Sequence, residues 1–208
     1  MTLKLPKIYP ITDREISGLS HTEQVRRLIA GGATLIQLRE KRQQAGDWFN
    51  DALTAARICR EAGVLCIVND RVDMAIAIGA DGVHLGQDDM HVAAARRLLG
   101  CGKIIGLSTH SIEQLEAALR EEIDYAAIGP IFATSTKSDH EPVIGLKTLL
   151  NAAQTSGNVP LVAIGGLTAE NLPAIFEAGA SSAAMIGAIL SDPERIAVIY
   201  RKLGQNAL

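Results

Sequence analysis

Eight short apolar runs recur along the chain, and most of them are continuous rather than alternating in hydrophobicity. They span residues 7–12, 34–38, 64–68, 82–85, 103–107, 125–128, 161–164 and 183–186. Strands that are buried on both faces have this continuous apolar pattern, because helices cover the sheet on each side. The runs therefore predict a parallel sheet that is covered by helices.

Helical patterns and polar turns separate the runs. Helices are expected over residues 21–30, 47–62 and 113–120, and two further helices are expected to begin at Thr168 and at Pro193, with Asp192 as the cap of the last one. Trp48 is expected to pack the second of these helices against the rest of the protein rather than to stack on a ligand.

Eight strand–helix units in 208 residues match the lower size limit of a (β/α)8 barrel. We therefore expect an α/β protein with a TIM-barrel fold and a single domain over residues 1–208. An open doubly wound sheet is the alternative, but it normally needs fewer strands for this length. In a closed barrel the active site lies at the carboxyl ends of the strands, so the residues that follow each run are the candidate site.

Composition limits the possible partners. The net charge is −3 and no basic block is present, which argues against a nucleic-acid surface. No apolar run reaches transmembrane length and the first ten residues do not resemble a secretory signal, so no membrane partner is expected. Cys59, Cys66 and Cys101 fit no metal motif and are expected to be buried free thiols in a reducing compartment. We expect a cytoplasmic protein.

Charged and polar residues follow the second run. Gln37, Arg39 and Lys41 alternate with Leu38 and Glu40, so an extended backbone would point all three to one side. An amide, a planar guanidinium and an ammonium group on one side suit a phosphate-rich ligand. The alternative is an exposed strand end whose charges are only solvated.

Two carboxylates follow neighbouring runs. Asp70 and Asp89 could together hold one Mg²⁺, with water and phosphate at its other positions. Each could instead cap the helix that follows it, because aspartate is common at helix starts. Asp88 is an alternative ligand to Asp89. Cations at adjacent strand ends favour a diphosphate that the metal bridges.

Two kinds of loop at the same end could bind phosphate. The longest stretch without a helix or strand pattern, residues 133–142, contains Thr134, Thr136 and Lys137, and long loops at this position serve as lids or phosphate binders. Gly166 and Gly187 follow the last two runs, where backbone N–H groups can receive a phosphate. Glycines needed only for tight turns are the alternative.

The histidines are less specific. His84 lies within a run and is expected inside the barrel, whereas His21, His91 and His140 are expected at the surface. His110 is either a general acid or base, or a polar residue near a helix start.

Several segments together resemble the thiamine phosphate synthase family. They are residues 9–13, residues 37–41, Asn69-Asp70, residues 81–89, Gly129-Pro130 with residues 134–137, and residues 164–166. The resemblance covers nearly the whole chain, and the order and spacing of the segments make it specific.

The resemblance implies a transferase that joins a hydroxymethylpyrimidine diphosphate to a thiazole phosphate and releases pyrophosphate. It implies Mg²⁺ held by Asp70 and Asp89, and it implies that charge on the leaving pyrophosphate is neutralised by Arg39, Lys41 and Lys137. The pyrimidine diphosphate would be bound by Gln37, Arg39, Lys41, Asn69, Ser108 and Lys137. The thiazole phosphate would be bound by Thr134, Thr136, Gly166, Ile186 and Gly187.

One position departs from the family pattern. The family usually has serine where Gly187 stands, so this chain lacks one hydroxyl donor and keeps only the backbone N–H. Two alternative functions remain: a thiazole tautomerase, in which a histidine matching His110 is catalytic and no diphosphate site is needed, and a non-catalytic sensor of a phosphate ligand. The expected partners are the small-molecule substrates, and a homo-oligomer is left open.

Overall fold

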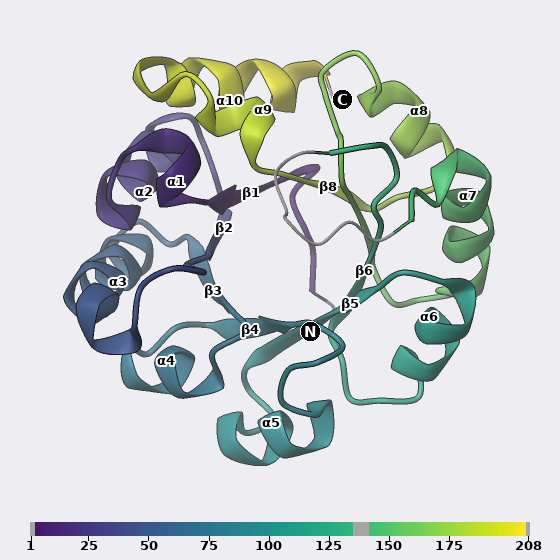
Figure 1. The fold of residues 1–208 in the computed structure, drawn as a ribbon, viewed down its shortest axis with the longest axis horizontal. Helices are drawn as coiled ribbons and strands as arrows, with labels where there is room; N and C mark the ends of the chain where they lie inside the picture. Colours follow the sequence, from purple (N-terminus) through teal and green to yellow (C-terminus); the bar gives the residue numbers. More distant parts are fainter. Residues whose placement is uncertain (1–2, 135–141, 207–208) are drawn as a thin grey trace.

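The fold is a closed barrel of eight parallel strands that are paired in chain order, from β1 to β8 and back to β1. The structure is a computed structural model and describes residues 3–134 and 142–206. Figure 1 looks down the barrel and shows the ring of strands with the helices arranged around it. The predicted TIM barrel is confirmed.

The strands are short, as the apolar runs indicated. They are β1 (Ile8–Thr12), β2 (Leu35–Leu38), β3 (Leu65–Asn69), β4 (Gly82–Leu85), β5 (Ile104–Thr109), β6 (Tyr125–Ile128), β7 (Leu161–Ile164) and β8 (Ser182–Met185). Seven of the eight start and end within one residue of the predicted runs. β5 continues two residues further than expected because Ser108 and Thr109 still pair with Ala127 and Ile128 of β6.

The helices cover the outside of the barrel. They are α1 (Arg14–Ser17), α2 (His21–Ala30), α3 (Ala45–Glu61), α4 (Val72–Ala77), α5 (Val92–Leu99), α6 (Ile112–Ala118), α7 (Gly145–Thr155), α8 (Leu172–Glu177), α9 (Gly187–Leu190) and α10 (Ile196–Asn206), with a 3-10 turn η1 (Pro193–Arg195) before the last.

One predicted helix start is wrong and one is confirmed. Thr168 opens a turn rather than a helix, because its N–H bonds to the Asn171 side chain (2.9 Å), and α8 begins only at Leu172. Helical structure begins at Pro193 as predicted, first as η1 and then as α10, and Asp192 occupies the cap position, although its side chain makes no cap bond. The predicted helix over residues 21–30 matches α2, which Ser20 caps through its hydroxyl.

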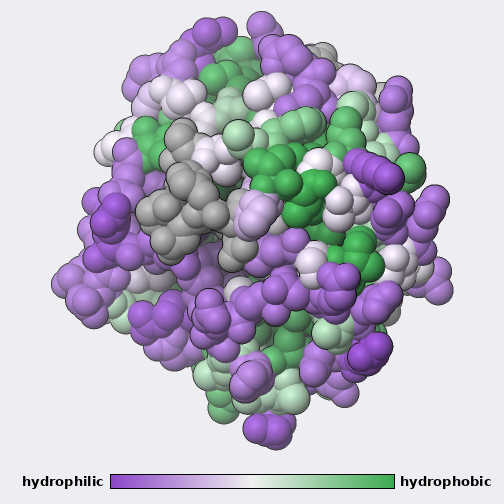
Figure 2. All heavy atoms as spheres, turned by 45° about the vertical axis from the view of Figure 1, so that its right-hand side comes forward, coloured by the Kyte–Doolittle hydropathy of each residue, from purple (hydrophilic) through white to green (hydrophobic). Residues whose placement is uncertain are grey.

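The core is aliphatic, with few aromatic side chains among the fully buried residues. Trp48 is buried between α3 and its neighbours, as expected. On the face shown in Figure 2, polar side chains cover most of the surface and apolar side chains gather near its centre. Within the described ranges, no helix is long and apolar enough to span a membrane.

Candidate active site

Two adjoining cavities lie at the carboxyl ends of the strands. The first, which we call the polar cavity, has a volume of about 920 Å³ and is lined by charged and polar residues that follow β2, β3 and β4. The second, the glycine-lined cavity, has a volume of about 750 Å³ and is formed by the ends of β5 to β8. Both cavities share a wall formed by Ser108, His110, Ile164, Ala184 and Ile186.

The predicted basic face of the second strand lies in the polar cavity. Gln37, Arg39 and Lys41 all line it, as the alternation indicated. The Arg39 side chain is 10% exposed and its Nη1 is paired with Asp13 Oδ2, while Lys41 Nζ donates to Asp70 Oδ2 at 2.5 Å. Gln37 and Arg39 are therefore not merely solvated, whereas Lys41 remains half exposed.

Asp70 and Asp89 also line the polar cavity, and neither caps a helix. The caps of α4 and α5 are Arg71 and His91, so the capping alternative is wrong. Asp70 has a left-handed backbone conformation (φ 63°), which aspartate tolerates better than most residues. Its N–H donates to the His84 carbonyl at 2.7 Å, which fixes the turn that directs the carboxylate.

The electrostatics of Asp70 indicate a second carboxylate close by. Burial raises the pKa of the Asp70 carboxyl, Lys41 opposes this rise, and the Asp89 carboxylate adds to it. Asp89 is itself oriented by the Gly86 N–H, which donates to its Oδ2 at 2.6 Å. Asp88 lines the cavity too but is exposed, so Asp89 is the carboxylate that acts on Asp70.

This pair fits a hard divalent cation. A carboxyl whose ionisation a neighbouring carboxylate disfavours becomes easier to ionise when a cation binds to both, and Mg²⁺ prefers oxygen ligands. Among the described residues, no group of three or more His, Cys, Asp or Glu side chains is arranged to hold a metal. Two carboxylates would leave the other positions of such an ion to water and to phosphate oxygens.

A chain of hydrogen bonds crosses the inner end of the polar cavity. Gln37 Nε2 donates to Tyr9 Oη (3.0 Å), Tyr9 Oη meets Tyr125 Oη (2.9 Å), and Tyr125 Oη meets His84 Nδ1 (2.9 Å). His84 Nε2 then meets Ser108 Oγ at 2.8 Å. Burial raises the pKa of both tyrosines, so both stay neutral. His84 lies inside the barrel, as expected.

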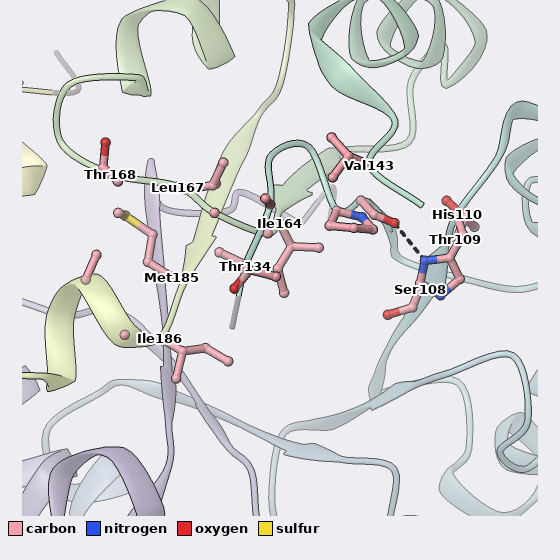
Figure 3. A pocket seen from close by; sticks show the side chains of 18 of the residues that line it. Ser108, Thr109, His110, Thr134, Val143, Ile164, Leu167, Thr168, Met185 and Ile186 are labelled. Carbon is pink, nitrogen blue, oxygen red and sulfur yellow. Dashed lines mark hydrogen bonds between the residues drawn. The ribbon is translucent and has the colours of Figure 1, made fainter. Parts of the chain in front are cut away.

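The glycine-lined cavity offers backbone donors. In the part of the chain that the structure describes, no hydrogen bond uses the N–H of Gly166 or Gly187, and both residues line this cavity. Gly166 has φ +63°, and a Cβ there would lie 2.5 Å from the Ala133 carbonyl oxygen, so only glycine fits. Figure 3 shows Thr134, Ile164 and Ile186 among the side chains around this cavity.

His110 lies at the wall between the two cavities. Its Nδ1 donates to the Gly129 carbonyl at 2.7 Å, the bond drawn as a dashed line in Figure 3. A carbonyl accepts only, so Nδ1 carries the proton and Nε2 is left as an acceptor in the neutral ring. His110 is therefore held in a defined orientation rather than being a mobile polar residue.

The structure thus brings together most of the predicted site residues. Asn69 and Ser108 line the polar cavity, and Thr134, Gly166, Ile186 and Gly187 line the glycine-lined cavity. Thr136 and Lys137 lie outside the described residues, so their roles stay predictions.

Sequence reasoning missed three residues in or beside the site and misplaced a histidine that lies outside it. Tyr9, Tyr125 and Asp13 were not predicted as site residues; the first two belong to strands, where alternate positions point into the barrel. His21 is fully buried rather than at the surface, with Nδ1 2.8 Å from Thr12 Oγ1 and its ring beside Trp48.

The fold and the two cavities define a (β/α)8-barrel enzyme that acts at the carboxyl ends of its strands. Comparison with known proteins gives the family. Residues 8–189 match the family model described as thiamine monophosphate synthase, and the chain belongs to this family.

Relatives and solved structures agree. The thiamine-phosphate synthase of Chloroflexus aurantiacus is 44% identical over 186 residues, which covers 89% of this chain and 85% of the relative. The solved thiamine phosphate pyrophosphorylase from Pyrococcus furiosus is 34% identical with a TM-score of 0.84, covering 97% and 96% of the two chains. A 3-hexulose-6-phosphate synthase (18% identity, TM-score 0.66, covering 94% and 99%) shares the fold alone.

Proposed function

We propose that this chain is a thiamine phosphate synthase that joins hydroxymethylpyrimidine diphosphate to thiazole phosphate, giving thiamine phosphate and pyrophosphate. The observation that carries the proposal is the pair of adjoining cavities, one with two carboxylates and several cations, the other with glycine N–H donors. Two phosphorylated substrates that must meet need two such cavities with a common wall.

The polar cavity suits the diphosphate. Asp70 and Asp89 are the residues that would hold Mg²⁺, which when bound neutralises charge on the leaving pyrophosphate. Arg39 and Lys41 donate to the diphosphate oxygens, and Lys137 is proposed to do the same. Their combined positive charge makes pyrophosphate a better leaving group than it is in water.

The inner end of the polar cavity suits the pyrimidine ring. Gln37 is fixed by its bond to Tyr9, and Ser108 by its bond to His84, so both present oriented polar groups. Asn69, at the end of β3, is proposed to contact the same substrate. Orientation of the ring holds its methylene carbon toward the wall that the cavities share.

The glycine-lined cavity suits the thiazole phosphate. The N–H groups of Gly166 and Gly187 and the hydroxyls of Thr134 and Thr136 are proposed to receive its phosphate. Ile186 lines both cavities and is proposed to pack against the thiazole ring.

The reaction itself needs no protein nucleophile. The bond between the pyrimidine methylene carbon and the diphosphate oxygen breaks, and its electron pair leaves with pyrophosphate. The aminopyrimidine ring stabilises the resulting cation, and the lone pair of the thiazole nitrogen forms the new carbon–nitrogen bond. The chain contributes position and electrostatic stabilisation.

This reading is favoured over the two alternatives. A tautomerase needs no diphosphate site, yet Arg39, Lys41, Asp70 and Asp89 all line one cavity. A non-catalytic sensor of a phosphate ligand does not require a pair of carboxylates beside these cations. Cys59 and Cys66 are buried as expected, whereas Cys101 is exposed, on the turn before β5. All three are free thiols, which supports work in the reducing cytoplasm. A homo-oligomer stays a prediction that light scattering tests.

The test is turnover with both substrates. Purified protein is incubated with Mg²⁺ and with each substrate alone or both together, and released pyrophosphate and thiamine phosphate are quantified. Equal amounts of both products, formed only when both substrates and Mg²⁺ are present, are expected. No product with both substrates would refute the proposal.

A further inference from the structure

One segment of the barrel rim, the end of β1, is not used by the proposed reaction. We propose that Asp13 is a positioning residue that holds the Arg39 guanidinium in the orientation needed to bind the diphosphate. The inference rests on the proposed function in taking a diphosphate as the ligand of the polar cavity.

The two oxygens of the Asp13 carboxylate have different hydrogen-bond partners. Oδ1 accepts the N–H groups of Glu15 (2.9 Å) and Ile16 (3.3 Å), which caps α1. Oδ2 pairs with Arg39 Nη1. The side chains of Asp13 and Arg39 are 7% and 10% exposed, so this pair is largely shielded from water and is weakly screened by salt.

Backbone contacts hold the two partners in register. Thr12 lies opposite Leu38 in the parallel pairing of β1 and β2, so Asp13 and Arg39 follow at the same level. Thr12 Oγ1 accepts the Arg39 N–H at 3.3 Å, and Gln24 Oε1 accepts the Asp13 N–H at 2.9 Å. The carboxylate and the guanidinium are therefore both anchored at their main chains.

The contact extends to the loop after β2, which carries Lys41. Glu15 pairs with Arg42 at 3.0 Å, and Arg14 Nη1 donates to Gln43 Oε1 at 3.1 Å. These two contacts are more exposed and contribute less than the buried pair. Together these contacts hold α1 against the loop after β2, which carries Lys41.

Electrostatics alone predicts the opposite effect of Asp13 on diphosphate binding. A carboxylate beside Arg39 reduces the positive potential that an anionic ligand meets, so its removal should tighten diphosphate binding. Positioning predicts weaker binding, because an arginine has many rotamers and loses side-chain entropy when it must be ordered by the ligand. The guanidinium has five donors, and the bond to Asp13 engages Nη1 while Arg39 still lines the cavity.

The experiment is a double-mutant cycle on pyrophosphate binding. Isothermal titration with Mg²⁺ and pyrophosphate is carried out on wild type, Asp13→Asn, Arg39→Ala and the double variant. Asparagine caps helices as well as aspartate does, so α1 is retained. Asp13→Ser, which also caps but cannot reach Arg39 with a charge, is the second variant. Ser20→Ala, which removes the cap of α2 only, is the matched control.

We expect Asp13→Asn and Asp13→Ser to weaken pyrophosphate binding by about tenfold, as loss of a hydrogen bond to a charged group predicts. In the Arg39→Ala background the same change should alter binding less than about twofold, since its effect passes through Arg39. The KM for the diphosphate substrate should rise in parallel while the KM for thiazole phosphate stays constant. Ser20→Ala should bind pyrophosphate as wild type does.

Tighter pyrophosphate binding in Asp13→Asn would overturn the inference, and so would an equal loss with and without Arg39. Melting curves of every variant separate a loss of binding from a loss of fold. Because the cycle reads binding and not turnover, it also distinguishes this inference from the proposed function. A wild type that binds pyrophosphate with the expected coupling but forms no thiamine phosphate contradicts only the latter.

Discussion

Replacing Asp70 by asparagine separates two effects of its carboxylate: the free-energy cost of burying it in the metal-free fold, and its proposed role in binding Mg²⁺. In the metal-free protein, burial and Asp89 raise the pKa of Asp70 despite the ion pair with Lys41. A carboxyl whose folded pKa is raised contributes stability that is fully present below the pKa of the unfolded chain. That contribution is lost as pH rises through the folded value. At neutral pH the Asp70 carboxyl therefore destabilises the metal-free fold, and the asparagine variant should melt at or above wild type.

Mg²⁺ and pyrophosphate should reverse this order of melting temperatures, so that wild type melts above the Asp70→Asn variant. At Mg²⁺ and pyrophosphate concentrations about 100 times their dissociation constant, linkage stabilises wild type by about 2.7 kcal/mol. For a chain of this length that corresponds to a rise in Tm of about 5–10 °C. Asp70→Asn loses one of the two carboxylates, so its Tm should hardly respond. Loss of the charge stabilisation should lower kcat by about 10²–10³-fold, or about 3–4 kcal/mol.

Two measurements check this prediction: differential scanning calorimetry with and without Mg²⁺ and pyrophosphate, and pyrophosphate release at saturating substrates. Asp88→Asn is the control, because it removes the same charge from an exposed neighbour. In wild type, Mg²⁺ affinity should fall as pH falls through the raised pKa of Asp70, since the proton competes with the ion. A metal-free variant that melts far below wild type, or one that keeps the Mg²⁺ response and wild-type turnover, would refute the reasoning.

Three further predictions concern other parts of the site. Gly187→Ser should restore a hydroxyl donor and lower the KM for thiazole phosphate by about 3–10-fold; an unchanged KM would show that the residue does not contact the phosphate. Lys137→Ala should slow pyrophosphate release in single-turnover assays more than it weakens thiazole phosphate binding, and equal rates would remove that role. In Gly106→Ala the new Cβ would lie 2.1 Å from the Tyr125 ring, so chemical denaturation should show a loss of about 1–3 kcal/mol, and an unchanged free energy of unfolding would contradict the packing.

The barrel could be predicted because its signals are local. Continuous apolar runs follow from burial of a strand on both faces, and each run coincides with a strand of the structure. Helix starts were less predictable where side chains had competing partners. Asn171 bonds back to Thr168 and delays α8, and nothing in the residue pattern distinguishes this turn from a first helical turn.

The candidate site could be predicted only for residues whose side chains are polar and follow a strand. Asp13 also meets this description, and its place opposite Arg39 follows from parallel pairing of the first two strands. The buried His21 could not be found in this way, because its burial depends on Trp48 and Glu40 from other segments. Tyr9 and Tyr125 are hydrogen-bonded to each other although they lie 116 residues apart in the sequence, and no local sequence pattern predicts such a contact.

A crystal structure with Mg²⁺, pyrophosphate and thiamine phosphate tests the account most directly. The account predicts the metal between Asp70 and Asp89, pyrophosphate against Arg39 and Lys41, and the thiazole phosphate group at the N–H groups of Gly166 and Gly187. Pyrophosphate bound away from Asp70, or a thiazole phosphate outside the glycine-lined cavity, would contradict it.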